Sequence, residues 1–496
     1  MTKTTFSAKL TPMNTTKALA WNTGVQIAGK IVSTAIGVAV VSLMTRYLGT
    51  TGFGLYSTAN SYFQIFAIIL DFGLNVTLVQ MLGEKAGDTA FENRLTSAVY
   101  TLRIVAAGTL LTAAAFLGLA LPYPWELKLA FFGIWGSFFF TALNKIVIGV
   151  QQRHLKMHVV ALGEVIGRLI LLGGVLGAMH YGWGLVAIVS IVSVGSTANF
   201  LVNILIAKKY ASFAWNWDTQ LWKTVLLRSW PIGVSIIFNL LYYKADSLIL
   251  SYVRPFSEVG VYSAAYRVLE ILVTLPFMYC GVLLPMISNA WASGNTKRFQ
   301  ELLSNSFTTM LLLAAPMVTG TIVLGDRIMA FVAGKDFAAS GDILKILMLA
   351  VGMIFFGTVS SHAIVALNKQ RYMLRWYIVI AITTCLGYIF FIPTYGMYAA
   401  AWLTVFAETC VALITTIIAL MTSGARIAIS QTIKIGVCSL LMALIIIPFE
   451  GAPLAFPILI GGAAYGILVL LTGIISKDTI RAIISIKGGT PTADNT

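Results

Sequence analysis

Charged residues are scarce in this chain. They make up 10% of its 496 residues, whereas hydrophobic residues make up 58%. A soluble domain usually carries about 25% charged residues, so this chain has too little polar surface to cover a water-soluble globule of its size. A mean hydropathy of +0.88 leads to the same conclusion. The sequence therefore predicts an integral membrane protein.

Cysteine is also rare, and the four cysteines lie singly inside apolar runs, without the CxxC spacing of a metal or redox site. We expect them to be small packing residues, and the sequence predicts no metal site and no cofactor. Long polar segments are missing too. The longest loop on the predicted outer side, residues 325–340, could not hold a catalytic domain, so we expect no enzymatic activity.

Long apolar runs are abundant. A helix needs about 20 residues to cross a bilayer, and the runs are continuous rather than alternating, which excludes a transmembrane barrel. We therefore predict an all-α protein with fourteen spans. They cover residues 18–44, 54–82, 96–121, 127–150, 158–179, 184–207, 225–251, 259–288, 304–324, 341–366, 373–392, 396–421, 431–449 and 454–475.

The basic residues sort by loop. With a cytoplasmic N-terminus, 20 of the 33 Lys and Arg lie in predicted cytoplasmic segments, 5 lie outside and the rest lie within spans. This asymmetry predicts that both termini are cytoplasmic, in a multi-pass protein of the cytoplasmic (inner) membrane. The first apolar run is longer than the 7–15 residues of a signal peptide, so we expect an uncleaved span. The net charge of +15 thus reflects topology, and no nucleic-acid partner is expected.

Three short phrases recur between spans 1–6 and spans 7–12. The pairs are FGLYSTA at 53–59 with VGVYSAA at 259–265, VQQRHLK at 150–156 with NKQRYML at 368–374, and HYGWGLVAI at 180–188 with TYGMYAAAW at 394–402. Because six is even, the two halves cross in the same direction, which is typical of transporters built from parallel repeats.

The repeat divides the chain into four parts. We predict an N-terminal lobe of six spans at 1–207, an interfacial linker at 208–224, a second six-span lobe at 225–421, and two extra spans with a cytoplasmic tail at 422–496. Four tryptophans lie among lysines in and just after the linker, which predicts a segment on the inner membrane surface. They are Trp215, Trp217, Trp222 and Trp230.

Two stretches resemble a known family. RYLGTTGFGLYSTANSYFQIFAIILDFGLN at 46–75 and VLGDRIMAFVAGKDFAASGDILKILML at 323–349 are similar to segments of the polysaccharide and O-antigen (Wzx-type) flippases. These belong to the multidrug/oligosaccharidyl-lipid/polysaccharide (MOP) exporter superfamily. The resemblance implies two MATE-like lobes, with spans 1, 2, 7 and 8 lining a central cavity.

The resemblance also implies a function. It would be the transfer of a polyprenyl-diphosphate-linked oligosaccharide from the cytoplasmic to the outer leaflet, by alternating access, for surface glycans such as the O-antigen of lipopolysaccharide. Expected partners are this substrate, membrane lipids and the polysaccharide polymerase machinery. Two alternatives stay open: a cation-coupled multidrug exporter of the same superfamily, and a membrane polysaccharide polymerase or ligase. The sequence does not identify the glycan, or whether sodium or protons drive transport.

The predicted spans contain eight basic and five acidic residues. Charges within a membrane are costly and mark functional sites, and a cationic excess suits a diphosphate. Lys244 and Arg267 lie at similar distances from the turn at Pro255, which predicts a shared depth. We therefore predict that Lys244 and Arg267 bind the diphosphate, assisted by Lys30.

Other charged residues are predicted to support these three. The supporting set is Asp71, Asp246, Glu270, Arg46 and Arg168. Structural alternatives are a Lys30–Asp71 pair, a Glu164–Arg168 pair within one helix, and an Arg267–Glu270 pair. Three further basic residues near the inner ends of spans are expected to extend to the membrane surface. They are Arg103, Lys145 and Arg228.

Overall fold

The computed structural model describes residues 12–85 and 87–474, and all regular secondary structure in this part of the chain is helical, without strands. The predicted all-α fold is confirmed. The helices are α1 (Pro12–Asp71), α2 (Leu74–Glu84), α3 (Thr89–Ala120), α4 (Trp125–Arg153), α5 (Met157–His180), α6 (Leu185–Ala207), α7 (Thr219–Val253), α8 (Phe256–Ala292), α9 (Thr296–Val332), α10 (Ser340–Ala366), α11 (Gln370–Ser423), α12 (Ile429–Ile446) and α13 (Ala455–Leu471). Short 3-10 turns at Lys335–Phe337 and Ile447–Phe449 precede α10 and follow α12.

Two helices are too long for one crossing. At about 1.5 Å per residue, the 60 residues of α1 and the 54 residues of α11 each exceed twice the roughly 30 Å of a bilayer core. Each is interrupted by a glycine with a positive φ, Gly49 (φ 66°) in α1 and Gly396 (φ 56°) in α11. Both glycines lie at or beside a predicted span boundary. With each long helix counted as two crossings, the described helices accommodate the fourteen predicted spans.

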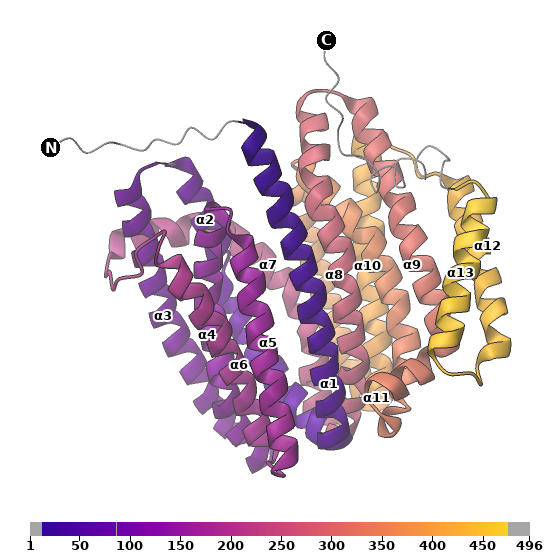
Figure 1. The fold of residues 1–496 in the computed structure, drawn as a ribbon, viewed down its shortest axis with the longest axis horizontal. Helices are drawn as coiled ribbons and strands as arrows, with labels where there is room; N and C mark the ends of the chain where they lie inside the picture. The colour runs from indigo at the N-terminus through magenta and orange to yellow at the C-terminus, as the bar shows by residue number, and fades with distance from the viewer. Residues whose placement is uncertain (1–11, 86, 475–496) are drawn as a thin grey trace. The chain divides into compact units, whose positions relative to one another are not determined.

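The chain forms two compact units, Met1–Ser263 and Ala264–Thr496, which are described separately. The predicted lobe and linker boundaries at 207, 224 and 421 remain predictions. In the first unit, α6 packs against both α4 and α5, and α1 runs along α5 (Figure 1). Aromatic rings fill the space between α1, α3 and α4: Tyr62 stacks on Phe131 with ring centroids 4.7 Å apart, and its hydroxyl donates to the Ala114 carbonyl.

In the second unit, α10 packs against α9 and α11 and is largely buried. The two C-terminal helices α12 and α13 lie side by side next to α9 (Figure 1). They are attached to it by polar contacts as well as by apolar packing. Tyr465 donates to the Leu312 carbonyl at 2.9 Å, and Thr308 donates to the Gln431 side chain at 3.0 Å. The two helices without a counterpart in the repeat are therefore fixed to the edge of this unit.

The backbone conformation can be compared for two of the three pairs of recurring phrases. Gly182 and Gly396, matched in the third pair, both have a positive φ, 69° and 56°, and both lie where one span ends and the next begins. The second pair is wrong in register. Its first copy ends α4, whereas its second copy begins α11, and the residues that share a turn conformation are Leu155 (φ 54°) and Asn368 (φ 55°). A similar dipeptide on opposite sides of the turn produced the apparent match.

Candidate functional site

A polar seam runs between α1 and α5 in the first unit. We define the seam as Gly29, Lys30, Ser33 and Gly37 of α1 with Ala161, Glu164 and Arg168 of α5. Lys30 pairs with Glu164 at 2.9 Å, and the Ser33 hydroxyl donates to the same carboxylate oxygen at 3.0 Å.

Glycines allow the two helices of the seam to approach. A methyl group at position 29 would lie 2.6 Å from the Ala161 Cβ, and one at position 37 would lie 3.7 Å from the Arg168 guanidinium. Residues that contact each other across the seam differ in residue number by about 131 at each level of the seam. The helices α1 and α5 therefore run parallel, which agrees with the crossing direction predicted for spans 1 and 5. The spacing places the Lys30–Glu164 pair and Arg168 one above the other.

Two of the predicted pairings are wrong. Lys30 pairs with Glu164 rather than Asp71, and Glu164 in turn is bound to α1 rather than to Arg168 on its own helix. An i, i+4 pair within a helix stabilises by only about 0.2–0.5 kcal/mol, so an approaching cation from another helix competes easily. The prediction that Lys30 forms an ion pair is therefore correct, but the predicted partner is wrong.

Asp71 instead belongs to a charged cluster at a break between α1 and α2. Its carboxylate accepts from Arg103 at 3.3 Å and from Lys145 at 3.0 Å. Phe72 and Gly73 have positive φ there, and Arg103 also donates to the Leu70 carbonyl at 2.7 Å, satisfying a group that the helix end leaves open. Arg103 is 1% exposed, so the expectation that it extends to the membrane surface is wrong.

Asp246 of α7 is 1% exposed and hydrogen-bonded by its own unit. The Tyr262 hydroxyl donates to one oxygen at 2.5 Å, and the Ser247 backbone N–H donates to the other at 2.6 Å. Lys244, also buried, acts electrostatically on this carboxylate. Tyr262 lies within the second copy of the first recurring phrase. The repeat gave no signal for this bond, because the position sixteen residues before Tyr56, which corresponds to Asp246, is Val40.

Two basic residues of the second unit pair with acids that lie close to them. Arg267 forms the alternative pair with Glu270, three residues later, at 2.7 Å. Lys345 near the start of α10 binds Asp326 at 2.8 Å and Asp342 at 3.2 Å. Lys30 and Lys244 belong to the first unit and Arg267 to the second. The three-residue diphosphate site therefore remains a prediction. Arg46 is exposed on α1, beside the Gly49 interruption.

A strap joins α6 to α7 on the predicted cytoplasmic side. Residues 208–218 run in a non-helical conformation over the first turns of α3. Asn93 accepts from the Ser212 N–H at 2.7 Å, Thr101 accepts from the Asn216 N–H at 2.9 Å, and Arg94 binds Asp218 at 2.7 Å. The strap fixes where α7 begins, because Asp218 also caps α7 by accepting from the Leu221 N–H.

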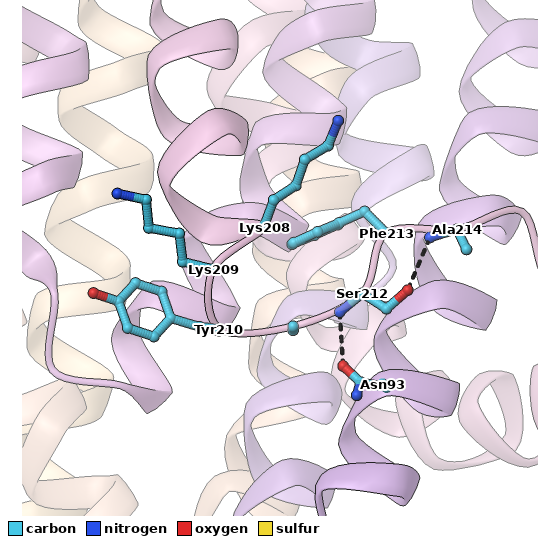
Figure 2. A pocket seen from close by; sticks show the side chains of 8 residues that line it. Asn93, Lys208, Lys209, Tyr210, Ser212, Phe213 and Ala214 are labelled. Carbon is cyan, nitrogen blue, oxygen red and sulfur yellow. Dashed lines mark hydrogen bonds between the residues drawn. The ribbon is translucent and has the colours of Figure 1, made fainter.

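The strap borders a surface hollow of about 550 Å³. Figure 2 shows its lining of lysine, aromatic and amide side chains, with Ser212 bonded to Asn93 beneath it. Trp215 and Trp217 are exposed beside the hollow, with ring centroids 6.1 Å apart, while Trp222 donates to the Ala98 carbonyl. Exposed tryptophans and lysines together are typical of a segment at a membrane interface. The hollow itself is lined by Asn93, Lys208, Lys209, Tyr210, Ser212 and Phe213, with Ala211 and Ala214.

Comparisons with known proteins agree with this architecture. A family model described as "Polysaccharide biosynthesis protein" matches residues 19–291, more than half of the chain, and the MatE model matches residues 231–391. The chain is 24% identical over 373 residues to the probable low-salt glycan biosynthesis flippase Agl15 of Haloferax volcanii, covering 73% of this chain and 75% of that protein.

Two solved structures share the fold. The lipid II flippase MurJ in an inward-closed conformation covers 92% of this chain and 99% of its own, with a TM-score of 0.77 and 18% identity. An inward-facing multidrug-resistance MATE transporter of the MOP superfamily covers 81% of this chain and 98% of its own, with a TM-score of 0.68 and 13% identity. The chain has the fold of these multi-pass membrane transporters and belongs to the polysaccharide biosynthesis protein family, as its resemblance to the polysaccharide flippases predicted.

Proposed function

We propose that the protein is a flippase, which moves a polyprenyl-diphosphate-linked oligosaccharide from the cytoplasmic to the outer leaflet of the cytoplasmic membrane by alternating access. The product would serve cell-surface polysaccharide synthesis, where polymerase machinery consumes it. Both termini would then be cytoplasmic, in keeping with the distribution of Lys and Arg. Family membership and the similarity to a probable glycan flippase support this proposal.

The observation that carries the proposal is the cationic excess inside the first unit. Its predicted spans hold six basic side chains against three acidic ones. The basic residues are Lys30, Arg103, Lys145, Arg168, Arg228 and Lys244, and the acidic residues are Asp71, Glu164 and Asp246. Charges at this depth are costly unless paired or bound, and a diphosphate is the part of a lipid-linked sugar that would bind an excess of cations.

The same observation argues against a multidrug exporter, the second candidate, which the MatE match to residues 231–391 brings into consideration. Exporters of cationic drugs need an acidic interior, the opposite of what the first unit holds. An enzyme that polymerises or ligates sugars would require a set of catalytic residues on a substantial outer loop, and the connections between the described helices are short. The protein would therefore act as a translocase.

Within this proposal, Lys244 and Arg267 bind the diphosphate and Lys30 assists from the other repeat. Asp246 and Glu270 would hold Lys244 and Arg267 when the substrate is absent. The Arg267–Glu270 pair at 2.7 Å supports this role for Glu270, and the burial of both Lys244 and Asp246 on α7 is consistent with it for Asp246. Whether sodium or a proton couples to the movement is a separate question for transport measurements under defined gradients.

A reconstituted assay tests the function. The protein is placed in liposomes containing a fluorescent polyprenyl-diphosphate disaccharide, and a membrane-impermeant reducing agent reports the fraction of dye on the outside. We expect the protein to accelerate exchange between leaflets for the diphosphate-linked sugar and to leave a fluorescent quaternary ammonium dye untransported. Movement of the dye without movement of the lipid-linked sugar would instead support the multidrug exporter.

A further inference from the structure

The α1–α5 seam places two cations and one acid near the middle of α5, where a helix that crosses a membrane is farthest from water. Arg168 lies eleven residues after the start of α5 and twelve before its end, which is about 17 Å along the helix from either end. Lys30 lies within a turn of the same depth because it binds Glu164. The seam therefore has a net charge of about +1 where a span is farthest from water.

These cations are accessible rather than enclosed. The Lys30 side chain is 42% exposed and Arg168 is also exposed. A bare charge against lipid tails at the bilayer centre is strongly unfavourable, and neither side chain can reach the interface from that depth without abandoning the seam. The exposed face of the seam must therefore border water or an anionic ligand.

The pairing inside the seam is unequal. Glu164 is already bound by Lys30 and by the Ser33 hydroxyl, both through the same oxygen. Arg168 has no ion-pair partner among the side chains that the structure describes, and its guanidinium lies over Gly37, 3.7 Å from where a methyl group at that position would be. The seam thus offers a diphosphate two cations. One is the Arg168 guanidinium, and the other is Lys30, whose present partner carries less negative charge than a diphosphate does.

We propose that Arg168 binds the diphosphate of the lipid-linked substrate and that Lys30 transfers to it from Glu164. This inference rests on the proposed function and adds a substrate-binding residue and a resting partner to it. A guanidinium binds phosphate oxygens through two parallel N–H donors. Glu164 acts as a counter-ion that occupies Lys30 until a more highly charged anion arrives, so the site discriminates diphosphate from monophosphate.

The proposal predicts changes of opposite sign at neighbouring residues. Arg168→Gln should weaken diphosphate binding about tenfold or more, because one charge-assisted contact is lost, and Arg168→Lys should retain part of it. Lys30→Gln should weaken binding as well. Glu164→Gln should strengthen binding, because it frees Lys30 while keeping an acceptor oxygen for Ser33. Damage to the fold would not produce a gain.

The experiment uses the full chain in lipid nanodiscs with undecaprenyl diphosphate and undecaprenyl monophosphate as probes, and native mass spectrometry measures affinity. Arg371→Gln, an exposed arginine at the start of α11, is the matched control and should bind as wild type does. Melting temperatures without ligand confirm that each variant is folded. Arg168→Gln should lose more affinity for the diphosphate than for the monophosphate.

Two failures can be told apart. Wild-type protein that binds neither lipid would overturn the proposed function, and the seam proposal with it. If Arg168→Gln binds the diphosphate as tightly as the wild type and Arg371→Gln do, the seam proposal alone is overturned. A weaker Glu164→Gln would show that the carboxylate contributes to the ligand site, contrary to its proposed role as a competing counter-ion.

Discussion

Gly54 and Gly260 pack against each other in a reciprocal arrangement. A methyl group on Gly54 would lie 1.8 Å from the Phe256 carbonyl oxygen, and one on Gly260 would lie 1.9 Å from the Thr50 carbonyl oxygen. Each of these partners precedes the opposite glycine by four residues, so the contact obeys a local two-fold relationship. The first recurring phrase of the sequence is thus a pair of helix surfaces that contact each other, with glycine where the backbones approach.

We expect alanine at either glycine to force the two helices apart. Both positions are blocked by backbone, which cannot rotate away, so Gly54→Ala or Gly260→Ala should lower stability by about 1–3 kcal/mol. Gly177→Ala is the matched control, because a methyl group on this α5 glycine would have nothing within 4 Å. Thermal unfolding in detergent measures the effect. If Gly54→Ala melts at the same temperature as Gly177→Ala, the helices do not pack this closely.

Two basic residues that look alike in the sequence should differ in energetic weight. Arg103 is 1% exposed and paired with Asp71, whereas Arg228 and its partner Glu84 have side chains 49% and 57% exposed. Removing Arg103 leaves the Leu70 carbonyl and one Asp71 oxygen without their donor, which costs about 1–3 kcal/mol for each group, while an exposed pair contributes at most about 1 kcal/mol. Arg103→Met should therefore lower the melting temperature far more than Arg228→Met does.

Removing both partners of the Arg103–Asp71 pair tests the cause of that loss. Asp71→Asn should also destabilise, since it leaves Arg103 and Lys145 without their shared anion. The double variant Arg103→Met/Asp71→Asn should lose less than the sum of the single changes, because the Arg103–Asp71 contact is lost only once, while Lys145 stays without its anion as in Asp71→Asn. Additive losses would indicate that the two side chains act separately.

The sequence predicted the spans more reliably than the pairings between them. Long apolar runs and loop charges are local signals, so the fourteen spans could be predicted directly from the sequence. The Lys30–Glu164 pair joins residues 134 positions apart, and nothing local indicates that α5 rather than the second half of α1 lies beside Lys30. The shifted match at Gln152 and Gln370 failed for a related reason, because similar residues on either side of a turn cannot reveal the turn itself.

The strap should loosen in acid. The Leu221 backbone N–H, followed by the Arg94 guanidinium, holds the pKa of the Asp218 carboxyl below its ordinary value. A lowered pKa favours the folded state at neutral pH, and this contribution is lost as the pH falls below about 3.9, the ordinary value, through the lowered one. The melting-temperature gap between wild type and Asp218→Asn should be constant from pH 7 to 5 and shrink below pH 4. A gap that widens in acid would contradict this.

The two recurring tyrosines provide the last comparison, since Tyr262 binds the buried Asp246 and Tyr56 does not. Tyr262 is fully buried, and its hydroxyl donates to the carboxylate at 2.5 Å. Tyr262→Phe leaves that oxygen without its donor, at a cost of about 1–3 kcal/mol. Tyr56→Phe, at the matching position of the first copy, removes the same atom from a partly buried ring and should change stability by less than about 0.5 kcal/mol.

A double-mutant cycle decides whether the acid is responsible. Asparagine at position 246 carries no charge, so losing the hydroxyl donor of Tyr262 leaves a neutral acceptor rather than a buried charge. The loss of stability caused by Tyr262→Phe should therefore be smaller in that background than in wild type. Thermal unfolding of the four proteins gives the coupling energy directly. Equal costs in both backgrounds would mean that the tyrosine acts through packing alone, and equal melting temperatures for Tyr262→Phe and Tyr56→Phe would mean that the repeat is symmetric in energy as well as in sequence.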